Sequence, residues 1–154
     1  MKNLVGDKVV KNLTVVDVNK AVVERLKNGI PNHPVYAAEV IEGFKRPCFF
    51  TQILMPTSSH ETINRTFNRR IVIIHYFSEN GTELENLMMY SRLEQIFGLK
   101  LRVKNRMLNV ENVRSDIADG VLQFKFDLDF YTRIEREDEY ELMQELKLNQ
   151  RGEG

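Results

Sequence analysis

The stretch 121-VLQFKFDLDF-130 alternates apolar and polar residues more strictly than any other part of the chain. Successive side chains of a β-strand point to opposite faces of a sheet, so the pattern predicts a strand with one buried and one solvated face. A sheet with one apolar face needs a second layer to cover that face. The apolar positions are Leu122, Leu128 and the phenylalanines Phe124, Phe126 and Phe130, and the polar ones are Gln123, Lys125, Asp127 and Asp129.

A helix that starts after Thr14 would supply part of that layer. Thr14 and Asp17 have the spacing of a capping box, and Leu13 and Val18 have that of a hydrophobic staple. Helical spacing predicts a buried stripe, and Gly29 suits a left-handed residue just past the helix end. The stripe consists of Val15, Val18, Val22 and Leu26.

A second capping box, Thr82 with Glu85, predicts another helix over residues 83–98, closed by Gly98. Its expected buried face consists of Leu84, Leu87, Met88, Ile96 and Phe97.

Runs of β-branched and aromatic residues at 35–39, 48–54 and 67–77 predict further strands. The dipeptide Asp119-Gly120 favours a tight hairpin before the alternating strand. Together these elements predict an α+β fold, with a mixed, mostly antiparallel sheet and two main helices packed on one face. Residues 1–134 are predicted to form a single domain. Residues 135–154 are predicted to form an acidic C-terminal extension, weakly helical to mobile.

Composition excludes several classes of function. The 22 basic and 22 acidic residues cancel, so no global charge attracts nucleic acid or lipid. No apolar run reaches signal-peptide or membrane-spanning length, which favours a protein that is cytosolic at synthesis and has no membrane partner. A single cysteine can form no internal disulfide.

No pattern of catalytic or cofactor-binding residues is found, so we expect no enzyme, no cofactor and no metal. Cys48 lies near Lys45 and Arg46, which could lower its pKa, but Pro47 is suited to open a strand and Cys48 is then a buried packing residue. The histidines lack metal-ligand spacing, and a site from His75, Asp127 and Asp129 would need carboxylates that the alternation places on the solvated face. Phosphate-binding glycine loops are absent.

Two oppositely charged segments suggest an interface. Lys100, Arg102, Lys104 and Arg106 alternate with other residues and are predicted to line one face of one strand. Residues 135–145 contain six acids and one arginine, including Glu137, Asp138, Glu139 and Glu141. We expect Arg102 and Arg106 to face residues 137–141 of another copy. Nucleic-acid binding by the basic strand is the alternative, although no aromatic residue interleaves the cations.

The polar segment 56–66 lies between two predicted strands and is too long for a tight hairpin turn. We expect it to be a projecting loop that contacts a partner or a neighbouring copy and becomes ordered on assembly. Its candidate contact residues are Ser58, His60, Asn64 and Arg65.

The order of elements and three stretches resemble the phage tail terminator family, which occurs in tailed bacteriophages, prophages and phage-tail-like particles of Gram-positive bacteria. The resemblance covers residues 13–133. The stretches are 41-IEGFKRPCFFTQIL-54 with its Gly-Phe-x-x-Pro-x-Phe-Phe pattern, 69-RRIVIIHYF-77, and 119-DGVLQFKFDLDFYTR-133.

The resemblance implies a structural assembly protein. Members form a ring, usually of six subunits, that caps the head-proximal end of the tail tube, stops tube growth and presents a joining surface. The implied partners are other copies of the chain, the tail tube protein, and a sheath or head–tail connector, with DNA contact only incidental in the lumen. Assembly is implied in the host bacterial cytoplasm, followed by incorporation into the virion or particle. A head–tail connector or other neck protein is the alternative role.

Overall fold

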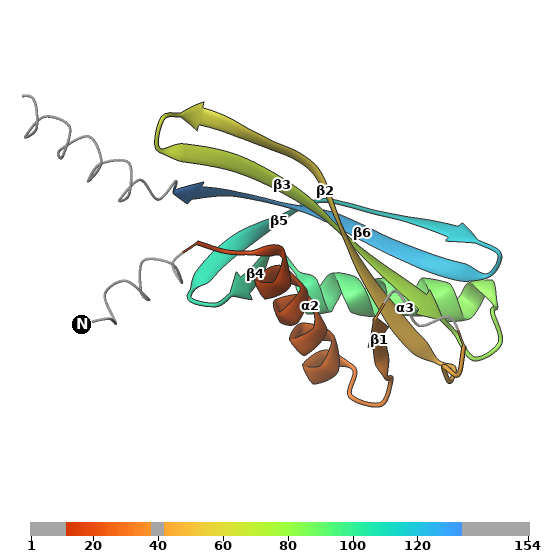
Figure 1. Cartoon of the computed structure of the whole chain (residues 1–154). Helices are drawn as coiled ribbons and strands as arrows, with labels where there is room; N and C mark the ends of the chain where they lie inside the picture. The colour runs from red at the N-terminus through yellow and green to blue at the C-terminus, as the bar shows by residue number, and fades with distance from the viewer. Residues whose placement is uncertain (1–11, 38–41, 134–154) are drawn as a thin grey trace, which may run out of the picture.

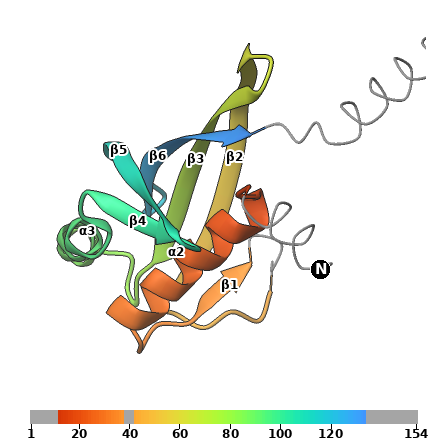
Figure 2. The same ribbon diagram turned by 90° about the vertical axis from the view of Figure 1, so that its left-hand side faces the viewer.

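The computed structural model describes residues 12–37 and 42–133. Six strands form one sheet in the order β1-β2-β3-β6-β5-β4. Both helices lie on the same side of this twisted sheet (Figures 1 and 2). The elements in chain order are α2 (Val15–Gly29), β1 (Val35–Ala37), β2 (Cys48–Thr62), β3 (Arg65–Phe77), α3 (Glu83–Phe97), β4 (Lys100–Val103), β5 (Arg106–Ala118) and β6 (Val121–Arg133).

The predicted fold class is confirmed. Only β1 is parallel to its neighbour β2, and every other pair in the described sheet is antiparallel. The even-numbered apolar side chains of β6, from Leu122 to Phe130, are all buried and join one core with side chains of both helices. The strict alternation therefore identified the core face of the sheet correctly.

The central strand β3 is apolar on both faces. Val72, Ile74 and Tyr76 belong to the core under the helices, while Phe77 points to the opposite face. There its ring lies 5.2 Å from the ring of Phe50 and 5.3 Å from that of Phe44. This second aromatic cluster explains why the strand needs apolar residues on both sides.

The predicted hairpin at Asp119-Gly120 is confirmed. Both residues have positive φ, 53° and 76°, and they connect Ala118 directly to Val121 across the β5–β6 ladder. Asp and Gly are residue types that adopt this conformation, which the two-residue turn between antiparallel strands requires.

The prediction of a loop at residues 56–66 is wrong. Strands β2 and β3 continue through this segment as a long hairpin that turns at Ile63 and Asn64. The hairpin extends past the helices (Figures 1 and 2), so its residues have no core to face and the sequence there loses its apolar pattern. Proline cannot donate to a strand ladder, and the register shift between Leu54 and Thr57 falls at Pro56.

Helix α2 begins as predicted, with the Thr14–Asp17 capping box formed in full. The role predicted for Gly29 is wrong: Gly29 is the last helical residue, and the C-cap residue that follows, Ile30, has a φ of −135°. A Cβ at Gly29 would lie 2.8 Å from Cδ1 of Ile96, so the glycine permits close approach of α3. Close packing, not a left-handed turn, explains this glycine.

Helix α3 is correctly bounded, but its predicted buried face is largely wrong. The buried side chains are Asn86, Met89, Leu93 and Phe97. Leu84, Leu87 and Met88 are instead 66%, 52% and 61% exposed. The core-facing stripe contains a polar residue, Asn86, and its amide Nδ2 donates to the carbonyl of Gly120 at 3.1 Å. This hydrogen bond ties the start of α3 to the β5–β6 turn.

We expect Asn86→Ala to destabilise the fold by about 1–3 kcal/mol, since the variant removes the donor to a backbone carbonyl and leaves a small cavity. Chemical denaturation measures the change. Gln95→Ala is the control: Gln95 is exposed on the same helix, and its replacement should change stability by no more than about 0.5 kcal/mol. Equal effects at the two positions would refute the anchoring role of Asn86.

Candidate functional site: a charged groove, a projecting hairpin and an apolar helix face

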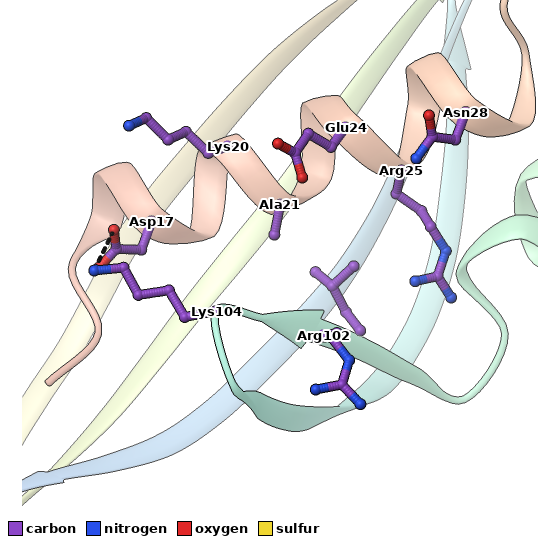
Figure 3. A pocket seen from close by; sticks show the side chains of 9 residues that line it. Asp17, Lys20, Ala21, Glu24, Arg25, Asn28, Arg102 and Lys104 are labelled. Carbon is purple, nitrogen blue, oxygen red and sulfur yellow. Dashed lines mark ion pairs between the residues drawn. The ribbon is translucent and has the colours of Figure 1, made fainter. Parts of the chain in front are cut away.

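A groove of about 490 Å³ lies between α2 and β4. Its charged lining consists of Asp17, Lys20, Glu24, Arg25, Arg102 and Lys104. Figure 3 shows Lys104 reaching Asp17 at the first turn of α2, and Arg25 pointing from α2 toward β4. The lining therefore holds four cations and two carboxylates, an excess of two positive charges.

Two of the four cations have partners within the fold. Lys104 Nζ lies 3.4 Å from Asp17 Oδ1. Arg25 Nε donates to the carbonyl of Ile96 at 2.9 Å, and its terminal nitrogen donates to that of Lys100 at 3.3 Å. Arg25 thus joins α2 to the last turn of α3 and to the start of β4, where a cation also complements the helix dipole.

Asp17 has two roles at one end of the groove. Its Oδ2 accepts from the backbone N–H of Thr14 at 2.9 Å, and its Oδ1 contacts Lys104. Burial acts to raise the pKa of Asp17, but the hydrogen bonds from Thr14 and Lys104 outweigh it, and the pKa is lowered. Asp17 is therefore ionised at neutral pH and compensates Lys104.

The structure separates the four cations that were predicted to line one strand face. Strand β4 ends at Val103, and Lys104 lies in the turn with a φ of 56°. Arg106 pairs with Val103 across the ladder, so it shares the face of that buried residue, opposite to Lys100 and Arg102. Its guanidinium donates to the carbonyl of Tyr131 at 3.0 Å. The prediction of a four-cation row is wrong, because a turn interrupts the alternation.

The predicted acidic contact residues Glu137, Asp138, Glu139 and Glu141 lie outside the described residues. Their pairing with a basic surface of another copy stays a prediction. Arg102 and Arg106 cannot supply that surface together, since they face opposite sides of the strand pair.

The other four predicted contact residues come together at the end of the β2–β3 hairpin, where two of them join β2 to β3 and one contacts β6. Ser58 Oγ donates to Oδ1 of the buried Asn68 at 2.9 Å. A hydrogen bond of 3.0 Å joins His60 Nδ1 and Thr66 Oγ1. Arg65 lies over the ring of Tyr131, with its guanidinium carbon 4.1 Å from the ring centroid. Asn64 is in the turn itself.

A third surface was missed by the sequence analysis. Leu84, Leu87 and Met88 are exposed on the outward side of α3. Their spacing of three and four residues puts them on one face of the helix. The sequence does contain a sign of this surface, because Met89, Leu93 and Phe97 form a second apolar stripe on the same helix. Only one of the two stripes can face the sheet, so the other must be exposed.

Cys48 is a buried residue of the sheet. Its side chain is 0% exposed, and burial raises the pKa of the thiol, with Arg46 offsetting only part of the shift. Arg46 itself donates to the carbonyl of Ser78 at 3.2 Å. The stretch around Cys48 builds the aromatic cluster, in which Phe44 packs against Phe50 with ring centroids 5.2 Å apart.

We expect Cys48 to resist alkylation in the native protein, since both its burial and its raised pKa lower the accessible thiolate. Iodoacetamide labelling followed by intact-mass measurement tests this. The same protein in denaturant is the control and should be labelled fully. Rapid labelling of the native protein would show that Cys48 is reactive after all.

The sheet face opposite the helices carries ion pairs. Asp129 forms a bidentate pair with Arg69, with both N–O distances 2.9 Å. Asp127 was predicted to be solvated but is only 7% exposed, and it pairs with Arg114 at 3.2 Å. The described residues contain no group of three or more His, Cys, Asp or Glu side chains placed to hold a metal ion. Neither helix in the described ranges is long and apolar enough to span a membrane.

The chain belongs to the phage tail terminator protein family, which matches residues 17–140. It is therefore a phage tail protein with a structural or assembly role, as the sequence resemblance indicated. No curated protein matches the chain. Among the solved structures that are similar, one has 12% identity over 79% of this chain and 96% of that one, with a TM-score of 0.45. A likeness of that size supports no inference.

Proposed function

We propose that the protein forms a closed ring of six copies at the head-proximal end of a phage or phage-like tail tube. The ring stops tube polymerisation and presents the surface to which the neck or connector joins. The observation that carries this proposal is the family match over residues 17–140. Assembly takes place in the host cytoplasm, and the partners are the tube protein and, beyond it, a sheath or connector protein.

A ring requires two different, complementary surfaces on each copy, because its contacts are heterologous. We propose the outward face of α3, formed by Leu84, Leu87 and Met88, as one of them. Exposed apolar side chains that gather on one face are typical of protein interaction sites. The end of the β2–β3 hairpin, with Ser58, His60, Asn64 and Arg65, is proposed to contact the tube or the next copy.

The test combines mass and function. Native mass spectrometry should give a species of six times the 18.1 kDa chain. Added to polymerising tail tube protein, the protein should stop growth and be found by electron microscopy at one end of each tube. A protein that remains monomeric, or that leaves tube length unchanged, contradicts the proposal. Binding to a head–tail connector but not to the tube would instead support the neck role.

A further inference from the structure

We propose that the groove between α2 and β4 is the binding site for the acidic segment 135–145 of the same chain. The proposal rests on the lining of the groove and on where the described chain ends. It does not depend on ring formation.

Charge complementarity is the first argument. With Lys104 paired to Asp17, and Arg25 bonded to two backbone carbonyls, Lys20 and Arg102 remain as the cations that an acidic occupant would meet, against one remaining carboxylate, Glu24. Within residues 12–37 and 42–133, neither Lys20 nor Arg102 has an ion-pair partner. The acids in segment 135–145 outnumber its one basic residue by five.

The position of the chain end is the second argument. Strand β6 ends at Arg133, whose N–H donates to Asn12 Oδ1 at 3.0 Å and whose carbonyl accepts from Asn12 Nδ2 at 2.7 Å. Asn12 lies just before α2, and Arg106, which bonds Tyr131, lies just after the β4 turn. The last described residues therefore lie beside the ends of both groove walls.

The acidic segment 135–145 is long enough to reach the groove and to extend along it. Asp17 and Asn28, which mark the ends of the groove along α2, are separated by about 16 Å at 1.5 Å per residue. A chain spans at most about 3.3–3.6 Å per residue, so Glu137 can lie up to about 14 Å from Arg133, and residue 145 up to about 40 Å away. The acidic segment can thus follow the whole groove of its own copy, and tethering favours this site over the groove of another copy.

Zero-length carbodiimide coupling of the full chain tests the proposal, since it joins a carboxylate to a lysine amine only where the two are in contact. Equal amounts of unlabelled and ¹⁵N-labelled chains are unfolded, mixed and refolded, so that any oligomer holds both. We expect coupling of segment 135–145 to Lys20 and Lys104, with both peptides of each product carrying the same isotope. Lys27, on the same helix but outside the groove lining, and Lys45 are the control lysines.

Arg102→Glu should lower coupling at Lys20 by about two- to fivefold, the range expected for exposed ion pairs, while Arg102→Lys should preserve it. Raising the salt concentration should also lower coupling at Lys20. Equal coupling at the control lysines, or no change in Arg102→Glu, would overturn the proposal. Coupling between copies would instead join a light peptide to a heavy one, in the proportion expected for random mixing of the chains. Such products would assign the groove to the acidic segment of a neighbouring copy, and they would also overturn the proposal. Native mass spectrometry of the same samples shows whether the ring forms, independently of the coupling result.

Discussion

Phe124→Ala and Phe126→Ala should each destabilise the protein by about 3–5 kcal/mol, since truncating a buried phenylalanine loses transfer free energy and leaves a cavity. Both side chains are 0% exposed. The ring of Phe97 lies 5.0 Å from that of Phe126 and 6.2 Å from that of Phe124, so both substitutions loosen the contact between β6 and α3. Denaturant unfolding followed by circular dichroism measures the losses.

Lys125→Ala is the matched control, because this residue lies between the two phenylalanines on the same strand. Its side chain points to the other face of the sheet, where Nζ lies 3.3 Å from Asp116 Oδ2. An ion pair of this kind contributes about 0–1 kcal/mol. Comparable losses at positions 124, 125 and 126 would show that β6 does not separate a buried from a solvated face.

The sequence predicted those features of the fold that local physical chemistry determines. The alternation in β6 identified the buried face of the sheet, and the Thr14–Asp17 and Thr82–Glu85 pairs identified both helix starts, because each pattern acts over a few residues. Asp119-Gly120 identified a turn for the same reason.

The predictions of the fold were wrong where contacts between distant parts of the chain determine the local structure. Two apolar stripes compete on α3, and the one that faces the core contains Asn86, whose amide bonds the carbonyl of Gly120, a residue 34 positions away. The polar end of the β2–β3 hairpin looked like a loop because it extends beyond the helices, where a strand needs no apolar face.

The candidate surfaces were predicted less well than the fold. Alternation continues from Lys100 to Arg106 in the sequence, but a turn at Lys104 reverses the strand and puts Arg106 on the other face. The groove beside β4 is formed together with Lys20 and Arg25 of α2, about 80 residues earlier in the chain. No local pattern could have indicated that pairing of elements.

Leu87→Lys combined with Met88→Glu should convert the proposed ring into smaller species without unfolding the subunit. The pair leaves net charge unchanged. Both positions are exposed in the single copy, so each change should alter the free energy of unfolding by no more than about 0.5 kcal/mol. In a ring contact, each such apolar side chain contributes about 1.5–3 kcal/mol, and a charged replacement would also be desolvated.

Native mass spectrometry of the double variant should therefore show the loss of the six-copy species, while thermal unfolding stays close to that of the original protein. Met107→Lys is the control, because Met107 is 51% exposed on β5 and lies outside the α3 face, so this variant should keep the ring. A double variant that still forms the complete ring would exclude the outward face of α3 as a ring contact. Ring formation would then have to depend on other surfaces, such as the end of the β2–β3 hairpin. If Met107→Lys also lost the ring, the effect would not be specific to α3, and the assignment of the interface to that helix would fail.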